Sequence, residues 1–293
     1  MLSILIPTYN YNVQPLVLEL QKQAEALSFV YEIIVCDDAS NTSQNITIDS
    51  NQSIHFIKNE TNLGRTQTRQ KLALKAKFEN LLFLDADVLP KTTTFVKEYF
   101  TILSQSYEVI CGGCTYEKNE PSKKCILRWK YGKNREEKSA LQRNIKPYSA
   151  VFSGNLLIKK SVFLKYNFNE NTNFYGMDIY FAYQLFFHAV SVKHYDVDVI
   201  HLGLESNEVF FKKSLESVVS RNTFLIDKPK IEEINSLIKH YKTLKKFKLD
   251  FVFSVKFKLF KSLLEKNILG NNPNLFLFDL YRLGYLCSLQ ASK

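Results

Sequence analysis

The stretch LLFLDADVLP, from Leu81 to Pro90, combines a strand-like run with a pair of acidic residues. Four apolar residues lead directly into Asp85 and Asp87, and a proline closes the segment. A short apolar run bounded in this way is typical of a buried strand. Two carboxylates at the end of such a strand need a cation or hydrogen-bond donors, because an unpaired buried charge is costly. The stretch therefore predicts a strand that delivers a charged site at its carboxyl end.

Similar apolar runs recur before and after this stretch and alternate with helix-like segments. The strand-like runs are Leu2–Ile6, Tyr31–Cys36, Ser53–Lys58, Asn80–Leu84 and Tyr107–Cys111, and the helix-like segments are Val13–Leu27, Arg65–Phe78 and Thr92–Ser104. This alternation is the pattern of a parallel sheet covered by helices, so we expect an α/β fold.

The second half of the chain has a different pattern. Residues 116–148 are polar and charged, and we expect them to form a long excursion from the sheet. Beyond it, we expect a strand at Ala150–Ile158, a helix at Met177–Ala189, and short strands at Val190–His194 and Val197–His201. From Asn207 onward the sequence is mostly helical and basic.

Polar residues follow the predicted strands where a ligand would bind. In an open α/β sheet, ligands bind beyond the carboxyl ends of the strands. The polar groups there are Pro7-Thr8-Tyr9-Asn10, Asp37-Asp38, Asn62-Leu63-Gly64-Arg65, and Asp85 with Asp87. Clustered carboxylates repel one another unless a cation or a hydrogen-bonding ligand shares them. Mg²⁺ or Mn²⁺, completed by phosphate and water, would relieve this repulsion.

Five motifs carry a family resemblance in their order and spacing. They are ILIPTYN, EIIVCDDAS, NLGRTQTR, FLDADVLP and YGMD. Together they resemble the inverting family 2 glycosyltransferases, which have the GT-A nucleotide-sugar fold. The resemblance covers about residues 1–205. It implies a catalytic domain with a nucleotide-binding half (1–112) and an acceptor-side half (113–205), built on a mostly parallel sheet flanked by helices, and it leaves 206–293 as a helical, basic extension.

The resemblance implies a role for each matching position. Nucleotide contacts fall on Pro7, Tyr9, Asp37, Asp38, Asn62, Gly64, Arg69 and Asp85. The metal ligands fall on Asp85, Asp87 and His201, and the catalytic base on Asp178. Gly154 and Asn155 match the acceptor-side strand, and Trp129 either stacks on an acceptor ring or is simply packed. Arg65 and Arg69, one helical turn apart, are either phosphate contacts, which is the favoured reading, or part of a solvated helix face.

The implied reaction is a direct displacement that inverts the anomeric carbon, as in a hexosyltransferase. Asp178 would take the proton of an acceptor hydroxyl while a divalent cation, Mn²⁺ or Mg²⁺, neutralises the departing diphosphate. A UDP-sugar is the donor expected by analogy, and the acceptor would be a glycan or a lipid-linked glycan. The family commonly has Glu-Asp where this chain has Met177-Asp178, so one carboxylate is missing. The QxxRW motif of the processive polymerases is also absent, which predicts transfer of a single sugar.

Two other functions remain open from the sequence. An apolar strand ending in Asp-x-Asp-x-Val also resembles the nucleophile loop of haloacid-dehalogenase-type phosphatases, with Asp85 attacking phosphate. That motif normally opens its domain, whereas here three strand-like runs precede it. A non-catalytic module that binds nucleotide sugar is the second alternative, favoured by the missing glutamate.

The net charge of +10 is concentrated near the end of the chain. Lys239–Lys266 holds nine lysines against Asp250 and Glu265, interleaved with Phe, Val and Leu. This segment is either a membrane-binding surface for anionic lipid or a solvated helical appendage. Phe253–Leu259 alternates like a strand, while the wider window fits a helix. No nucleic-acid-binding motif accompanies the charge, so nucleic acid is disfavoured.

The cellular location expected from the sequence is the cytoplasm. The first residues read as a strand rather than as a leader, and the five cysteines do not suggest a disulfide framework. No apolar run is long enough to span a bilayer. Peripheral binding to the inner face of the membrane is the alternative that the basic segment raises.

Overall fold

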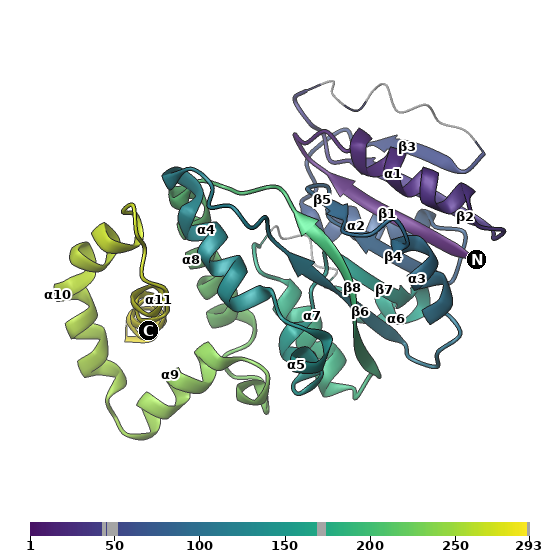
Figure 1. Ribbon diagram of the computed structural model, residues 1–293. Helices are drawn as coiled ribbons and strands as arrows, with labels where there is room; N and C mark the ends of the chain where they lie inside the picture. The colour runs from purple at the N-terminus through teal and green to yellow at the C-terminus, as the bar shows by residue number, and fades with distance from the viewer. Residues whose placement is uncertain (43–44, 46–51, 169–173, 292–293) are drawn as a thin grey trace. The chain divides into compact units, whose positions relative to one another are not determined.

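The computed structural model describes residues 1–42, 45, 52–168 and 174–291 (Figure 1). The strands are β1 (Leu2–Thr8), β2 (Tyr31–Asp37), β3 (Ile54–Lys58), β4 (Asn80–Leu84), β5 (Val88–Pro90), β6 (Val109–Thr115), β7 (Asn155–Lys159) and β8 (Val192–His201). The α-helices are α1 (Gln14–Glu25), α2 (Arg65–Lys75), α3 (Phe95–Ile102), α4 (Ile126–Tyr131), α5 (Ala140–Asn144), α6 (Lys160–Tyr166), α7 (Asp178–Phe187), α8 (Asn207–Phe224), α9 (Ser236–Lys246), α10 (Asp250–Ile268) and α11 (Leu275–Ala291).

The described strands form one mixed sheet in the order β3-β2-β1-β4-β7-β6-β8-β5. The pairs β3–β2, β2–β1, β1–β4 and β6–β8 are parallel, whereas β7 runs antiparallel to β4 and β6, and β5 runs antiparallel to β8. This arrangement confirms the mostly parallel central sheet. It also brings the carboxyl ends of β1, β2 and β4 to one edge, and β7 begins at that same edge.

Helices cover both faces of this sheet because successive crossovers run in opposite directions. The step from β1 to β2 moves one way along the sheet, and the step from β3 to β4 moves back past β1. Right-handed crossovers then place α1 and α2 on opposite faces. The buried side of α1 carries Leu16, Val17, Leu20 and Ala24 at helical spacing. Burial of each large side chain there contributes roughly 1.5–3 kcal/mol.

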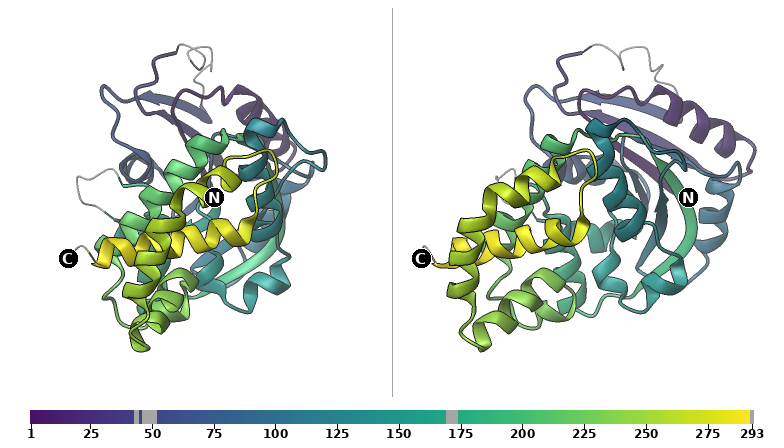
Figure 2. Two further views of the ribbon diagram at one scale, coloured as in Figure 1. Left: turned by 90° about the vertical axis from the view of Figure 1, so that its left-hand side faces the viewer. Right: turned by 60° about the vertical axis from the view of Figure 1, so that its left-hand side comes forward.

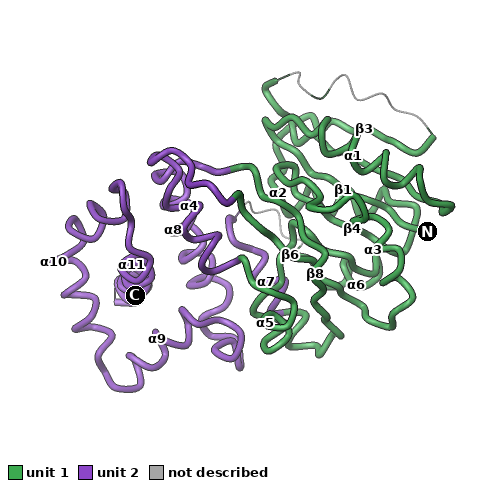
Figure 3. Tube along the Cα trace, viewed as in Figure 1, with its two compact units in different colours: residues 1–117, 137–173, 184–203 green, residues 118–136, 174–183, 204–293 purple. Residues whose placement is uncertain are grey.

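The chain divides into two compact units (Figure 3). The first comprises residues 1–117, 137–173 and 184–203 and contains the sheet. The second comprises residues 118–136, 174–183 and 204–293 and is helical. The boundary expected after residue 205 lies close to the division after Gly203. The second unit also takes two segments from within the range expected for the catalytic domain.

The core of the second unit is aromatic. Phe210, Phe257, Phe278 and Tyr281 are buried together, contributed by α8, α10 and α11. Figure 2 shows α10 and α11 running side by side. A Cβ at Gly284 of α11 would meet the Phe257 ring at 2.4 Å, so this glycine permits the close packing of the two helices. None of the described helices is long and apolar enough to cross a membrane.

Three expectations about local structure were wrong. Residues 116–148 contain α4 and α5 rather than a long irregular excursion, and α5 begins at a capping box in which Ser139 and Gln142 bond each other's backbone. The two short strands expected at 190–201 are one strand, β8, whose pairing with β6 continues through a bulge. The strand-like alternation at Phe253–Leu259 lies inside α10.

Asn155, at the start of β7, is fully buried and locks the sheet. Tyr99 of α3 donates its hydroxyl proton to Asn155 Oδ1 at 2.6 Å. Asn155 Nδ2 donates to the carbonyls of Gly113 in β6 and Val197 in β8, at 3.0 and 2.8 Å. The amide is thus engaged inside the sheet, and the acceptor contact expected for Asn155 stays a prediction beside this structural role.

Replacement of this amide is expected to destabilise the fold. Asn155→Ala removes the acceptor of a buried hydroxyl and the donor to two buried carbonyls, so the free energy of unfolding should fall by about 2–4 kcal/mol. Denaturant unfolding measures the change. The matched control is Asn134→Ala, at an exposed asparagine whose substitution should change stability by less than about 0.5 kcal/mol. Equal stability of the two variants would contradict this role.

Candidate active site

The loops that follow β1 and β2 are bonded to each other. The Asn10 N–H donates to Ser40 Oγ at 2.7 Å, and the Asn41 N–H donates to Asn10 Oδ1 at 2.9 Å. Asp37, buried at the end of β2, accepts from the Ser40 N–H at 2.7 Å. Pro7 lies within β1, and Tyr9 directly beyond it is exposed. The two loops therefore form one frame around an exposed aromatic ring.

Asp38 fixes the loop that precedes α2. Its carboxylate accepts from the N–H groups of Leu63 and Gly64, each at 2.8 Å, and from Asn59 Nδ2 at 2.7 Å. Asn62 Nδ2 donates back to the Asp38 carbonyl at 3.2 Å. Gly64 has φ of 79°, a conformation that favours glycine. The predicted nucleotide residues Asp38, Asn62 and Gly64 thus belong to one hydrogen-bonded unit.

Two arginines of α2 hold Asp85. Arg65 Nη2 lies 2.6 Å from Asp85 Oδ2, and Arg69 Nη2 lies 2.6 Å from Asp85 Oδ1. Arg69, with a side chain only 5% exposed, also donates to the hydroxyl and carbonyl of Ser153. Burial raises the pKa of Asp85, but the charges of Arg65, Arg69 and His201 outweigh it and lower the pKa below its usual value. Both oxygens of the Asp85 carboxylate are therefore paired with arginine, which favours its charged form.

Gly154 allows this carboxylate its position. The Asp85 N–H donates to the Gly154 carbonyl at 3.1 Å. A Cβ at Gly154 would meet Asp85 Oδ2 at 2.4 Å, so any larger residue would displace the carboxylate. The sequence also predicts that Gly154 contacts the acceptor. This contact stays a prediction, in addition to the observed packing against Asp85.

Asp87 lies in a different environment from Asp85. The pairing of β5 with β8 places Asp87 beside His201, with 3.6 Å between Asp87 Oδ2 and His201 Nε2. Tyr116 stacks on the His201 ring at 5.4 Å. Burial raises the pKa of Asp87, His201 partly offsets this, and the charge of Asp85 raises it further. The net effect is a raised pKa, so this carboxylate lacks enough compensating positive charge.

The Asp87–His201 pair fits a divalent cation. A carboxylate oxygen and an imidazole nitrogen are both ligands that Mn²⁺ accepts, and a cation would supply the missing charge. A Cβ at Gly203 would meet Asp87 Oδ2 at 2.1 Å, so this glycine leaves room for the carboxylate. Among the described residues, no group of three His, Cys, Asp or Glu side chains is placed to hold a metal. Ligands from phosphate and water would have to complete the shell.

Asp178, the expected catalytic base, is the first residue of α7 and lies in the second unit. The loop before it rests on α8 of the same unit. Ser220 Oγ donates to the Tyr175 carbonyl at 2.7 Å, and a Cβ at Gly176 would meet Ser217 Oγ at 2.3 Å. Gly176 has φ of 88°, which favours glycine. Ser217 and Ser220 belong to no recognisable sequence motif, so their support of this loop could not be predicted from the sequence.

Trp129 also lies in the second unit, half-buried in α4. Its stacking on an acceptor ring stays a prediction.

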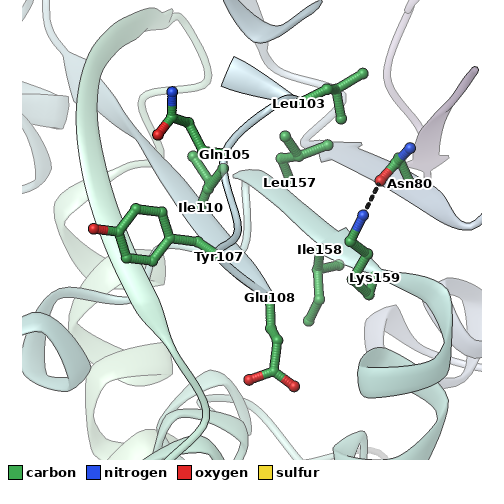
Figure 4. A pocket seen from close by; sticks show the side chains of 9 residues that line it. All are labelled: Asn80, Leu103, Gln105, Tyr107, Glu108, Ile110, Leu157, Ile158 and Lys159. Atoms are coloured by element: carbon green, nitrogen blue, oxygen red, sulfur yellow. Dashed lines mark hydrogen bonds between the residues drawn. The ribbon is translucent and has the colours of Figure 1, made fainter.

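A small cavity in the first unit is separate from the strand-end cluster. It has a volume of about 10 Å³ and is lined by Asn80, Tyr107, Glu108, Leu157 and Lys159 among others (Figure 4). Such a volume holds about one water molecule. Asn80 begins β4, whereas Asp85 follows its other end, so this cavity does not contribute to the candidate site.

The family model for glycosyl transferase family 2 matches residues 3–165, more than half of the chain. The chain belongs to glycosyl transferase family 2. The matched segment contains the strand-end motifs of β1, β2 and β4, the α2 arginines and Gly154. Family membership argues against the phosphatase alternative, in which Asp85 would be a nucleophile.

Relatives and solved structures agree with this family. An uncharacterized glycosyltransferase of Haemophilus influenzae is 37% identical over 90 residues, which is 30% of this chain and 29% of that relative. The fold is similar to that of the mannosyltransferase PcManGT from Pyrobaculum calidifontis, solved in complex with GDP-Man and Mn²⁺ (TM-score 0.55, 13% identity, 81% of this chain and 68% of that chain). It is also similar to S. aureus TarS (TM-score 0.50, 18% identity, 81% and 42%). These likenesses concern the fold, which is of the GT-A type expected.

Loss of the Asp38 carboxylate is expected to loosen the loop before α2. Asp38→Ala leaves the N–H groups of Leu63 and Gly64 without their acceptor, which should cost about 1–3 kcal/mol of stability. Hydrogen exchange at these two amides should become faster. Glu60→Ala, at an exposed carboxylate of the same loop, serves as the control and should leave both amides protected. Unchanged exchange in Asp38→Ala would show that the loop does not depend on this carboxylate.

Proposed function

We propose that this protein transfers a single sugar from a nucleotide-sugar donor to a hydroxyl group of a glycan or lipid-linked glycan, with inversion, as a hexosyltransferase. The observation that carries the proposal is that Asp85 and Asp87, the two carboxylates of the DxD motif, have different partners. Asp85 is paired with two arginines, whereas Asp87 lies beside His201 and keeps a raised pKa, because burial and the charge of Asp85 outweigh the nearby positive charges. A divalent cation that also binds the diphosphate would supply positive charge beside the Asp87 carboxylate.

Asp87 and His201 are the proposed ligands for Mn²⁺ or Mg²⁺, with phosphate and water completing the shell. The bound cation would stabilise the charge of the departing nucleoside diphosphate. Asp85, whose oxygens both bond arginine, remains a candidate ligand only if an arginine moves away. Its proposed role is to hold Arg65 and Arg69 at the site.

The arginine pair is suited to phosphate. Two guanidinium groups around one carboxylate leave a net positive charge, and arginine can donate to more than one acceptor. Arg65 is 41% exposed and sits on the first turn of α2, where the helix dipole also favours an anion. We therefore assign Arg65 to phosphate contact, ahead of the solvated-face alternative. Arg69, which is buried, orients Asp85 and Ser153.

The nucleotide would bind against the frame of the β1 and β2 loops. Tyr9 offers an exposed ring for the base, Pro7 precedes it in β1, and Asp37 and Asp38 lie at the end of β2 in the same frame. UDP is proposed by analogy with the family. The complex of the mannosyltransferase PcManGT contains GDP-Man, so GDP-sugars belong in the same donor panel.

The sugar transfer itself requires a base for the acceptor. Asp178 would accept the proton of the acceptor hydroxyl while that oxygen forms a bond to the anomeric carbon. The bond from this carbon to the diphosphate oxygen breaks at the same time, and the electron pair leaves with the nucleoside diphosphate. Met177, which is buried, stands where the family commonly has a glutamate, so Asp178 would act as a single carboxylate. Trp129 and Gly154 are the remaining acceptor-side candidates.

The catalytic role of Asp178 is tested by nucleoside diphosphate release from UDP- and GDP-sugars with an acceptor panel. Asp178→Asn should lower kcat by about 100-fold or more, because general base catalysis contributes on this scale. The affinity for free UDP should stay within about threefold, since the base does not contact the nucleotide. Asp227→Asn, at an exposed aspartate of the second unit, is the control. Full turnover by Asp178→Asn would exclude the proposed base, and nucleotide binding without turnover by the wild type would favour the binding module.

The metal site has its own test. Asp87→Ala and His201→Ala should each weaken Mn²⁺ binding by about tenfold or more in the presence of UDP, because each removes one of two protein ligands. Electron paramagnetic resonance of free Mn²⁺ measures this directly. Asp196→Asn, at an exposed aspartate of β8, should bind Mn²⁺ like the wild type. Unchanged affinity in both alanine variants would place the metal elsewhere.

A lipid-linked acceptor would require contact with a membrane. The basic C-terminal segment supplies the candidate surface.

A further inference from the structure

One side of α10 exposes large apolar side chains along most of its length. Phe251, Val255, Leu259 and Leu263 recur every four residues and are 66%, 43%, 76% and 65% exposed. Residues at this spacing lie on one face of a helix. Val252 and Phe260 widen the same face, and the stripe from Phe251 to Leu263 runs for about 18 Å. We call these six residues the apolar face of α10.

The opposite side of α10 anchors the helix to its own unit. Ser254, Phe257 and Ile268 are buried there. The Phe257 ring lies 4.9 Å from the Tyr281 ring in an edge-on contact, and Gly284 allows α11 to approach it. The side of α10 that faces the core is therefore already buried, and the apolar face is a different side of the helix. It is a second apolar surface beyond what the unit needs for packing.

Lysines border this apolar face. At 3.6 residues per turn, exposed Lys258 lies at the edge of the face next to Phe251, exposed Lys256 lies in the row between Val252 and Phe260, and exposed Lys266 follows the end of the stripe. Lys245, Lys246 and Lys248 precede the helix and are also exposed. Such side chains can rest their aliphatic parts on an apolar surface while their ammonium groups reach anionic headgroups.

This combination selects an anionic membrane as the occupant. A contiguous exposed apolar patch indicates an interaction site. A second copy of this chain would bring the same lysines against one another, which is electrostatically unfavourable. A helix with an apolar face and basic residues beside it is of the kind that lies in the plane of the membrane interface.

We propose that the apolar face of α10 inserts into the headgroup region of an anionic membrane, with the bordering lysines on the lipid phosphates. Binding would occur without any catalytic residue, so it does not depend on the proposed sugar transfer. Its consequence for activity, access to lipid-linked acceptors, does rest on the proposed function.

Flotation of the full chain with lipid vesicles tests the proposal. The wild type should partition onto vesicles of phosphatidylcholine with phosphatidylglycerol at least about tenfold better than onto phosphatidylcholine alone, and high salt should weaken this binding. The double variant Leu259→Glu/Leu263→Glu should lose at least about tenfold of it, because two side chains that insert are replaced by anions. Circular dichroism checks that the variant is folded.

A matched control separates the α10 face from general surface hydrophobicity. Leu18→Glu/Leu141→Glu makes the same change at two exposed leucines of the first unit and should bind vesicles like the wild type. A second variant, Lys256→Gln/Lys258→Gln, should lose the preference for anionic lipid while keeping its fold. The proposal is overturned if folded Leu259→Glu/Leu263→Glu binds like the wild type, or if anionic and neutral vesicles are bound equally. It is also overturned if the wild type forms a dimer, seen by light scattering, that these leucine substitutions dissociate.

Discussion

The double ion pair of Asp85 with Arg65 and Arg69 is the interaction on which the candidate site depends. It joins the end of β4 to the first turns of α2, and Arg69 extends the connection to Ser153 before β7. Removing one partner of a buried ion pair typically costs about 3–5 kcal/mol, because the remaining charge is left uncompensated. Here one carboxylate compensates two cations, so the arrangement keeps a net positive charge for an anionic ligand.

The same ion pairs place Asp85 and Asp87 in different electrostatic environments. Burial acts on both carboxylates, but arginine charge lowers the pKa of Asp85, whereas burial and the charge of Asp85 raise that of Asp87. Neighbouring titratable groups with pKa values moved in opposite directions are a common feature of active sites. From this difference we propose that Asp85 holds Arg65 and Arg69 in place, whereas Asp87 and His201 bind a divalent metal ion.

The strand ends and the residues of this site could be predicted from the sequence, but the contacts that each residue makes could not. Strand ends were readable because each apolar run stops at polar residues, and β4 was predicted with its observed bounds. The pairing of Arg65 and Arg69 with Asp85 was not predicted, because the sequence favours phosphate contacts for the two arginines and does not show which carboxylate they meet. The structural role of Asn155 was not predicted, because its partners come from α3, β6 and β8, which no local spacing reveals. Helices α4 and α5 were not predicted, because they are short and their formation depends on capping and packing rather than on a periodic apolar pattern.

We propose that a cation bound by Asp87 and His201 also binds the diphosphate of the nucleotide. An anomalous difference map from crystals grown with Mn²⁺ and UDP tests it most directly. We expect a manganese peak in contact with the Asp87 carboxylate, His201 Nε2 and the diphosphate, with Asp85 still bonded to Arg65 and Arg69. Bound UDP with no manganese at Asp87 and His201, or manganese held by Asp85 in place of its arginines, would contradict it.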